Sequence, residues 1–317
     1  MTHGAHTVDR FMHDGKRVFY TRSSFDKPAE IYQSGLTMPG EAQQLTFINE
    51  EALKTVRLSK FEERYCKTFD GKQLQSWVVF PPDFDPKKKY PVVLYCQGGP
   101  QSPMNSQWGT RWSMQLIAAQ GFIVIAPNRR GTFGFGVEWT KTISKNWESG
   151  TKDLLAAIDD FSKEPFVDKN RMAAVGGSFG GYSVFWLAGH HNGRFKCFIS
   201  HCGLFNLESF YLTTDELFFA DYDMGASFWR ATDNPTFTKF NPIKMVKNWN
   251  TPILIIQGGQ DFRVPESEGF QAFQAAQLQG IKSQFLYFPT EGHWIKRPQN
   301  SVRWQREFMG WLNEHLH

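Results

Sequence analysis

The sequence contains no long apolar run, and this absence excludes whole classes of protein. No stretch reaches the roughly 18 consecutive apolar residues of a membrane span, and the first residues lack the charged start and apolar run of a signal peptide. No membrane association is therefore expected. The chain as printed is predicted to be cytoplasmic, or periplasmic if it is a piece of a longer secreted protein.

Net charge and cysteine are also scarce. Lysine and arginine total 35 and aspartate and glutamate total 31, so the net charge is only +4. This excess is too small and too scattered to indicate nucleic-acid binding. The four cysteines show no Cys-x-x-Cys spacing, which favours buried free thiols over zinc ligands or a disulfide framework: they are Cys66, Cys96, Cys197 and Cys202. No metal and no cofactor is expected.

Residues 1–60 differ from the rest of the chain in their pattern. Short strand-like segments flank a turn at Asp14-Gly15 and a break at Pro28, which predicts a small β-meander. Small isolated sheets are marginal in water, and exposed strand edges recruit other strands. We therefore expect this segment either to fold onto the rest of the chain or to build a homo-oligomer, because several of its apolar residues would otherwise lack partners: Phe19, Tyr20, Ile31 and Tyr32.

Residues 61–317 alternate between strand and helix patterns. A hairpin around Asp70-Gly71 comes first, and one helix pattern follows Thr151 as its N-cap. The remaining strands are short unbroken apolar runs, typical of strands buried on both faces: 92–95, 122–126, 172–175, 198–199, 253–256 and 285–288. The alternation predicts an α/β fold with a mostly parallel sheet of about eight strands, flanked by helices.

One stretch within this region has the pattern of a nucleophile elbow. Gly176-Gly-Ser178-Phe-Gly180 follows an apolar strand and precedes an apolar helix pattern. A serine in a strained turn needs small neighbours two positions away on either side, and the two outer glycines satisfy this. The amides at the start of the helix would then face an anion that forms beside Ser178.

Two later loops supply an acid and a base in the chain order of α/β hydrolases. Asp261 follows the 253–256 strand and His293 follows the 285–288 strand, so the order is Ser178, Asp261, His293. His293 would take the proton of Ser178, and Asp261 would fix its tautomer. For the oxyanion hole, the expected donors are the backbone N–H of Phe179 and that of Gly99, in the Gln97-Gly-Gly-Pro100 loop.

Together these residues resemble the prolyl oligopeptidase family of serine peptidases, in its dipeptidyl-peptidase and acylaminoacyl-peptidase branch. The resemblance covers residues from about 60 to 317 and rests on five short motifs: Gly98-Gly-Pro100, Pro127-Asn-Arg-Arg-Gly131, Gly176-Gly-Ser-Phe-Gly-Gly-Tyr182, Asp261-Phe-Arg-Val-Pro265 and Gly292-His293. It implies an α/β-hydrolase fold for residues 61–317, with Ser178, Asp261 and His293 in the catalytic positions. One departure is Gln97, where relatives usually have histidine.

The resemblance also implies a substrate pocket and a second domain. The pocket for the residue before the scissile bond would be lined by residues that composition alone leaves as loop: Phe179, Leu204, Leu207, Phe210, Arg263 and Val264. Family members carry a β-propeller over the active site, and residues 1–60 resemble only its last blade.

Three functions remain open at this point. The first is a serine hydrolase that cleaves peptide bonds after an apolar residue through an acyl-enzyme. The second is a carboxylesterase acting on small acyl esters, since an open site with an intact triad should cleave the more reactive ester. The third is a non-catalytic binding module with the same fold, but such proteins would be expected to lose a triad residue, and none is lost here.

Overall fold

The structure is a computed structural model that describes residues 3–36 and 42–317. The chain forms two compact units. One consists of Met1–Glu62, Val79–Phe84 and Asn105–Phe122, and the other of Glu63–Val78, Asp85–Met104 and Ile123–His317. The sequence predicts a boundary between two domains near residue 60, and this boundary stays a prediction.

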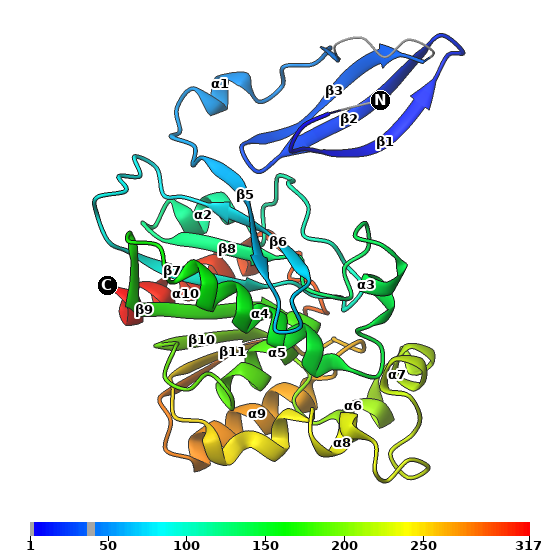
Figure 1. Cartoon of the computed structure of the whole chain (residues 1–317), viewed down its shortest axis with the longest axis vertical. Coiled ribbons are helices and arrows are strands. Elements are labelled where there is room, and N and C mark those ends of the chain that lie inside the picture. Colours follow the sequence, from blue (N-terminus) through cyan, green and yellow to red (C-terminus); the bar gives the residue numbers. More distant parts are fainter. Residues whose placement is uncertain (1–2, 37–41) are drawn as a thin grey trace. The chain divides into compact units, whose positions relative to one another are not determined.

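The N-terminal segment is an antiparallel meander, as the sequence predicts. Its four strands follow one another in the order β1 (Thr7–His13), β2 (Arg17–Ser24), β3 (Lys27–Gly35) and β4 (Gln43–Gln44) (Figure 1). The first turn is held by the Asp14 carboxylate, which accepts the N–H groups of Lys16 and Arg17 at 2.9 and 2.7 Å. The short helix α1 (Glu50–Leu53) follows.

Two of the apolar residues expected to lack partners in this segment are buried. Tyr20 and Tyr32 lie opposite each other on β2 and β3, their rings stack at 6.2 Å, and they are 4% and 8% exposed. These two side chains therefore have partners within the described structure. Ile31 is exposed, as are Phe11 and Met12 on β1. Self-association through this segment stays a prediction.

The larger sheet has eight strands and the predicted α/β-hydrolase architecture. Its spatial order is β12-β11-β10-β9-β7-β8-β6-β5, and the pairs from β12 to β8 are parallel. The strands are β5 (Phe61–Lys67), β6 (Gln73–Val79), β7 (Tyr90–Cys96), β8 (Ile123–Pro127), β9 (Val167–Gly177), β10 (Cys197–His201), β11 (Ile253–Gly258) and β12 (Ser283–Phe288). The central strands are almost entirely buried, which explains their unbroken apolar sequences.

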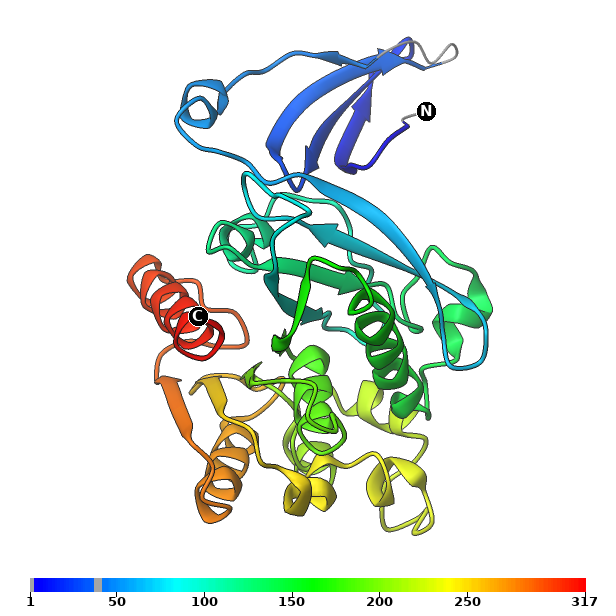
Figure 2. The same ribbon diagram turned by 60° about the vertical axis from the view of Figure 1, so that its left-hand side comes forward.

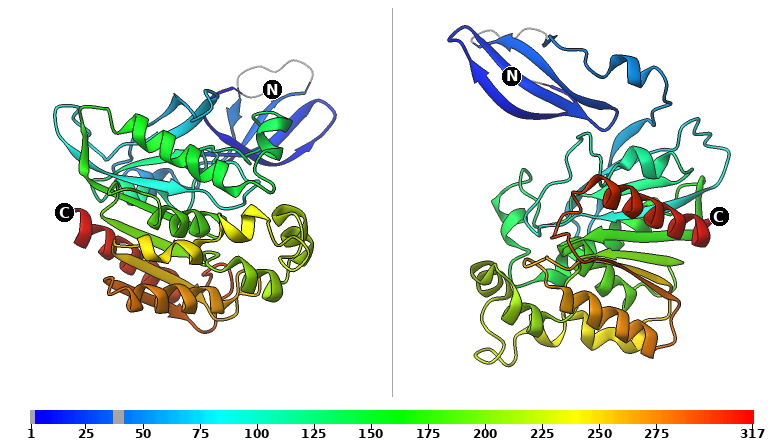
Figure 3. Two further views of the ribbon diagram at one scale, coloured as in Figure 1. Left: turned by 60° about the horizontal axis from the view of Figure 1, so that its bottom comes forward. Right: turned by 180° about the vertical axis from the view of Figure 1, so that it is seen from behind.

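Helices cover both faces of the central strands. The helices are α2 (Met114–Ala118), α3 (Val137–Lys141), α4 (Trp147–Phe161), α5 (Phe179–Ala188), α6 (Leu207–Thr213), α7 (Leu217–Met224), α8 (Pro235–Thr238), the 3₁₀ helix η1 (Pro242–Asn248), α9 (Glu266–Leu278) and α10 (Pro298–Leu316). Figure 2 shows α10 on one face of the sheet and α4 and α5 on the other. From behind, α10 lies across the strands (Figure 3).

The start of α4 differs from the prediction. Thr151 was expected to cap the helix, but α4 begins at Trp147, and the Thr151 hydroxyl donates to the Glu148 carbonyl inside the helix.

None of the helices within residues 3–36 and 42–317 combines the length and apolar content needed to cross a membrane.

A buried ion-pair cluster joins α4 to the loop after β8. Arg130 donates to both oxygens of Asp153 at 2.8 and 3.0 Å and to Asp70, in the β5–β6 turn, at 2.8 Å. The side chain of Asp153 is fully buried, and that of Arg130 is 4% exposed. The guanidinium group also lies over the rings of Phe69 and Trp139.

We predict that Asp153→Ala lowers the free energy of unfolding by about 3–5 kcal/mol, because it leaves Arg130 buried with one carboxylate fewer. Chemical denaturation measures this loss. Asp159→Ala is the matched control on the same helix, since its pair with Arg194 is half-exposed and its removal should cost about 1 kcal/mol or less. Equal losses in the two variants would contradict the assignment.

Candidate active site

Ser178 lies at the sharp turn between β9 and α5. Its backbone has φ 60° and ψ −126°, a left-handed conformation that is strained for a residue with a side chain. The flanking glycines are required by space: a Cβ on Gly180 would lie 2.0 Å from the carbonyl oxygen of Cys96, and one on Gly176 would lie 2.6 Å from the Gly180 backbone. The predicted strand, turn and helix are thus confirmed, together with their steric cause.

The start of α5 and the loop after β7 meet at Ser178. Phe179 contributes the first amide of the helix, whose N–H has no carbonyl four residues earlier within the helix. From the other side, a Cβ on Gly98 would lie 3.7 Å from the Cβ of Ser178, so backbone passes close to the serine. Gly99, with φ +119°, turns this loop. The Gln97 side chain is engaged within the loop by donating to the Ser102 hydroxyl at 3.2 Å.

The guanidinium group of Arg129, a residue to which the sequence assigned no role, holds this loop. Its Nη2 donates to the carbonyls of Gln97 and Gly98, each at 2.9 Å, and its Nη1 to that of Pro100 at 2.8 Å. The group is fully buried and lies 4.4 Å from the ring centre of Phe179. Burial lowers the pKa of Arg129 to about 10, which still leaves it charged at neutral pH. The signal in the sequence was a pair of arginines directly after a buried strand.

Asp261 and His293 are brought together as predicted. Asp261 follows β11, His293 follows β12, and Oδ2 of the acid is 2.7 Å from Nδ1 of the ring. The other carboxylate oxygen accepts the N–H groups of Arg263 and Val264 at 3.0 and 2.9 Å. With the aspartate side chain fully buried and the histidine side chain 11% exposed, the carboxylate fixes the ring and leaves Nε2 as the reactive nitrogen.

The sulfur of Cys202 lies 3.9 Å from this nitrogen. Cys202 directly follows β10, and the N–H of Ser178 donates to the carbonyl of the preceding residue, His201, at 2.9 Å. Ser178 and Cys202 therefore lie side by side at the ends of neighbouring parallel strands. Among the described residues, no hydrogen bond joins the Ser178 hydroxyl to His293; such bonds are often long before substrate binds.

Sequence reasoning missed the position of Cys202. The prediction of a free, buried thiol is confirmed for Cys202, Cys96 and Cys197, whereas Cys66 is free but only half-buried. Yet Cys202 directly follows a strand, as Ser178 does, and its φ of 41° is also in the left-handed region. The signal was available: Cys202 follows the apolar 198–199 run, next in the chain after the strand that carries the serine.

The residues predicted to line the pocket are mostly buried core residues. Relative exposure is 2% or less for Phe179, Leu204, Leu207, Phe210 and Val264. The segment that contains Leu204 and Leu207 is held by Glu268 on α9, which accepts the N–H groups of Phe205 and Asn206 at 2.8 and 2.7 Å. Burial raises the pKa of Glu268 to about 7.

Arg263 differs from the other predicted pocket residues, because it is half-exposed and pairs with Asp215 and Glu216 at 3.2 and 2.9 Å. The pocket roles of all six residues stay predictions.

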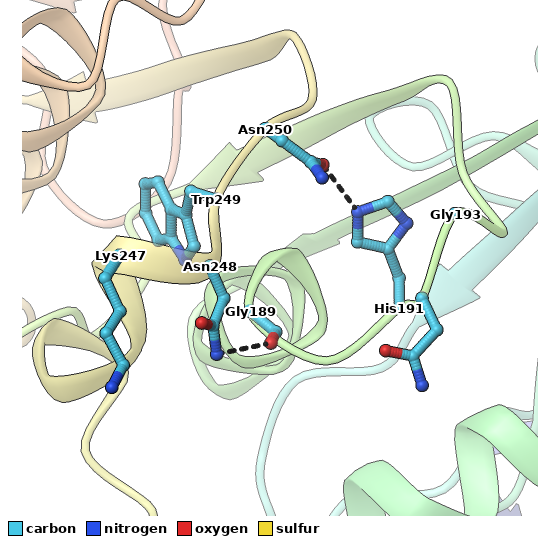
Figure 4. Close-up of a pocket in the computed structure, with 8 residues that line it drawn as sticks. Gly189, His191, Gly193, Lys247, Asn248, Trp249 and Asn250 are labelled. Atoms are coloured by element: carbon cyan, nitrogen blue, oxygen red, sulfur yellow. Dashed lines mark hydrogen bonds between the residues drawn. The ribbon is translucent and has the colours of Figure 1, made fainter.

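A surface cavity of about 470 Å³ lies elsewhere, and no predicted site residue lines it. His191 and Asn250 face each other there at 3.3 Å, and Asn248 donates to the Gly189 carbonyl (Figure 4). This cavity is at the C-terminal end of α5, whose ten residues separate it from Ser178 by about 15 Å. It has no part in the arrangement around Ser178.

Comparisons with known proteins agree with the fold. Residues 108–317 match the sequence profile described as the prolyl oligopeptidase family. Dipeptidyl-peptidase 5 of Porphyromonas gingivalis is 45% identical over 320 residues, which cover 100% of this chain and 46% of that protein. Dipeptidyl-peptidase 5 of Schizosaccharomyces pombe is 36% identical, over 84% of this chain and 40% of that protein. The chain thus spans somewhat less than half the length of these relatives.

Solved structures share the fold. An acylaminoacyl peptidase of Pyrococcus horikoshii superposes with a TM-score of 0.90 at 24% identity, over 99% of this chain and 50% of that one. Dipeptidyl peptidase 4 of Porphyromonas gingivalis gives 0.83 at 21% identity, over 98% and 43%. At this level of identity the likeness concerns the fold.

The neighbours of His293 lead to a prediction on pH. Burial lowers the pKa of the ring, but the sulfur of Cys202 and the carboxylate of Asp261 raise it by more, so the net shift is upward from 6.5. A histidine base works only when neutral. We therefore expect kcat/KM to fall, as pH decreases, through an apparent pKa above 6.5.

Cys202→Ala should move this acid limb to lower pH, because it removes one of the groups that raise the pKa of His293. Steady-state rates from pH 5 to 10 measure the shift, with Cys66→Ser as a control that keeps the wild-type profile. An unchanged limb in Cys202→Ala would show that the sulfur does not act on His293.

Proposed function

Because the chain belongs to the prolyl oligopeptidase family, we propose that it is the catalytic part of a serine peptidase. In this proposal Ser178 is the nucleophile, His293 the general base and Asp261 the residue that orients the base. The observation that carries it is the 2.7 Å bond between Asp261 and His293, at the same sheet edge as a serine in a strained strand-to-helix turn.

The reaction uses these groups in two steps. His293 Nε2 accepts the proton of Ser178 Oγ while the oxygen attacks the scissile carbonyl, and then returns that proton to the departing amine. The acyl-enzyme is hydrolysed when His293 takes a proton from water, which attacks in turn. Asp261 keeps its hydrogen bond to Nδ1 and stabilises the imidazolium that forms in each step.

The oxyanion of each tetrahedral intermediate is bound by backbone amides. We assign this role to the N–H groups of Phe179 and Gly99, as the sequence suggests. Arg129 supports the assignment, because its bonds to the carbonyls of Gln97, Gly98 and Pro100 hold that loop in place beside the serine. Donors fixed before the charge develops need no reorganisation during reaction.

The substrate class is proposed from the relatives and from the apolar residues at the site. The two relatives described above are named dipeptidyl-peptidases, so a peptide is the proposed substrate, and the family resemblance implies an apolar residue before the scissile bond. We assign the pocket for that residue to Phe179, Val264 and the segment of Leu204, Leu207 and Phe210, as the family resemblance implies; their side chains are almost wholly buried in this structure. These names do not favour a carboxylesterase or a non-catalytic module as the main function.

The first test identifies the nucleophile. An organophosphorus serine reagent should label Ser178, and Ser178→Ala should lower kcat by about a thousandfold or more, with the melting temperature within a few degrees of wild type. Peptide mapping by mass spectrometry locates the label. Cys202→Ala is the decisive control: if that variant loses all turnover and Ser178→Ala does not, the nucleophile is the neighbouring sulfur.

The second test concerns the substrate. Matched dipeptidyl and acyl-aminoacyl amides, each with Phe or Glu before the scissile bond, are compared by kcat/KM alongside a p-nitrophenyl ester. We expect the dipeptidyl substrate with Phe to be the best amide and to exceed its Glu counterpart by about tenfold or more. Hydrolysis of the ester alone, or equal rates with Ser178→Ala, would contradict a peptidase.

A further inference from the structure

Three side chains of the types that bind metals lie together at the site, and one of them is the proposed base. Cys202, Asp261 and His293 each present a ligand atom, and the three atoms lie within 4.8 Å of one another. Cys202 and Asp261 are buried and His293 is half-buried. No other group of this kind was found in residues 3–36 and 42–317. The sequence predicts no metal, and the peptidase mechanism proposed above does not use one.

The three donors are not equally available. Asp261 already accepts two backbone N–H groups and the Nδ1 of His293. The carboxylate therefore orients the histidine, in the arrangement by which proteins commonly support a metal-bound imidazole. The atoms left to bind an ion are His293 Nε2 and Cys202 Sγ.

The separation of these two atoms suits a single ion. Typical Zn–S and Zn–N bonds are about 2.3 and 2.0–2.1 Å, and their sum exceeds the 3.9 Å between Sγ and Nε2. One ion therefore fits between the two atoms with a bent S–metal–N angle. The backbone holds the sulfur there, because the Cys202 N–H donates to the Ile256 carbonyl at 2.8 Å.

We propose that Cys202 Sγ and His293 Nε2 form an inhibitory site for a thiophilic divalent cation such as Zn²⁺ or Cd²⁺. On binding, the thiol releases its proton to solvent and the sulfur donates an electron pair to the ion, while neutral His293 donates the lone pair of Nε2. The inhibition rests on the proposed function, because a nitrogen bound to metal cannot accept the proton of Ser178.

The experiment separates binding from inhibition. Cd²⁺ and Zn²⁺ are titrated into wild type, Cys202→Ala, Cys202→Ser and Cys66→Ser, and the rate of each protein is compared with its own metal-free rate. Binding is followed independently by the ultraviolet charge-transfer absorption between thiolate and cadmium, which is also recorded for Ser178→Ala.

We expect wild type and Cys66→Ser to be inhibited over the same metal range and restored by a chelator. Cys202→Ala should need about 10–100 times more metal for half inhibition, and its cadmium band should be weaker by one thiolate. Ser178→Ala should keep the full band, since the serine is not a ligand. Cys202→Ser preserves the size of the side chain and replaces Cys202→Ala as the test variant if the alanine variant does not fold. We expect the same loss of metal sensitivity and the same weaker cadmium band in it.

The outcomes distinguish this inference from the proposed function. Equal metal sensitivity in wild type and in both Cys202 variants would overturn the inference while leaving peptidase activity in place. An active wild type with neither inhibition nor a Cys202-dependent band would do the same. A Cys202-dependent cadmium band in a protein that cleaves no substrate would support the metal site and contradict the proposed peptidase.

Discussion

The close approach of three backbone segments at Ser178 is the constraint on which the site depends. The end of β7, the turn after β9 and the start of α5 meet very closely. A Cβ on Gly180 would lie only 2.0 Å from the carbonyl oxygen of Cys96, which is too close for two heavy atoms that are not bonded. Any side chain at Gly176 or Gly180 would separate these segments. The contact places the first amide of α5 and the glycine loop after β7 on two sides of the serine. The strained φ of Ser178 is the conformational cost of this arrangement.

Arg129 stabilises the glycine loop after β7, which this contact places beside Ser178. A loop that turns its N–H groups toward a ligand must bury its carbonyls elsewhere, and a buried carbonyl without a donor costs free energy. One guanidinium group satisfies three carbonyls of the loop and also lies on the ring of Phe179. Arginine stays charged when buried, and its planar group of N–H donors can bind several carbonyls at once. The two amides assigned to the oxyanion hole are thereby linked through a single side chain.

Local sequence patterns predicted the architecture. The features that these patterns could not predict depend on contacts between segments that are distant in the sequence. The apolar runs and the glycines around Ser178 predicted the strands, their mostly parallel sheet and the elbow, because each depends on neighbours in sequence. The order Ser178, Asp261, His293 predicted the bond between acid and base, because strand ends meet at one edge of a parallel sheet. The N-cap at Thr151 failed because a helix can begin earlier when its first turn packs in the core. The burial of Tyr20 and Tyr32, the role of Arg129 and the place of Cys202 depend on which strands become neighbours, and the sequence does not state that order.

The pairing of β9 with β10 places two nucleophilic side chains, Ser178 and Cys202, next to each other at one edge of the sheet, and the surroundings of each bear on which of them reacts. Sulfur is the better intrinsic nucleophile, and the sulfur of Cys202 lies 3.9 Å from Nε2. Acyl transfer, however, also requires donors for the oxyanion. Ser178 immediately precedes the amides of α5, a helix of ten residues. Cys202 is followed by a glycine and an irregular segment before the seven-residue α6 begins at Leu207, so no helix begins directly after it. For this reason we propose the oxygen as the nucleophile, and the sulfur as a group that tunes the base and binds a competing metal ion.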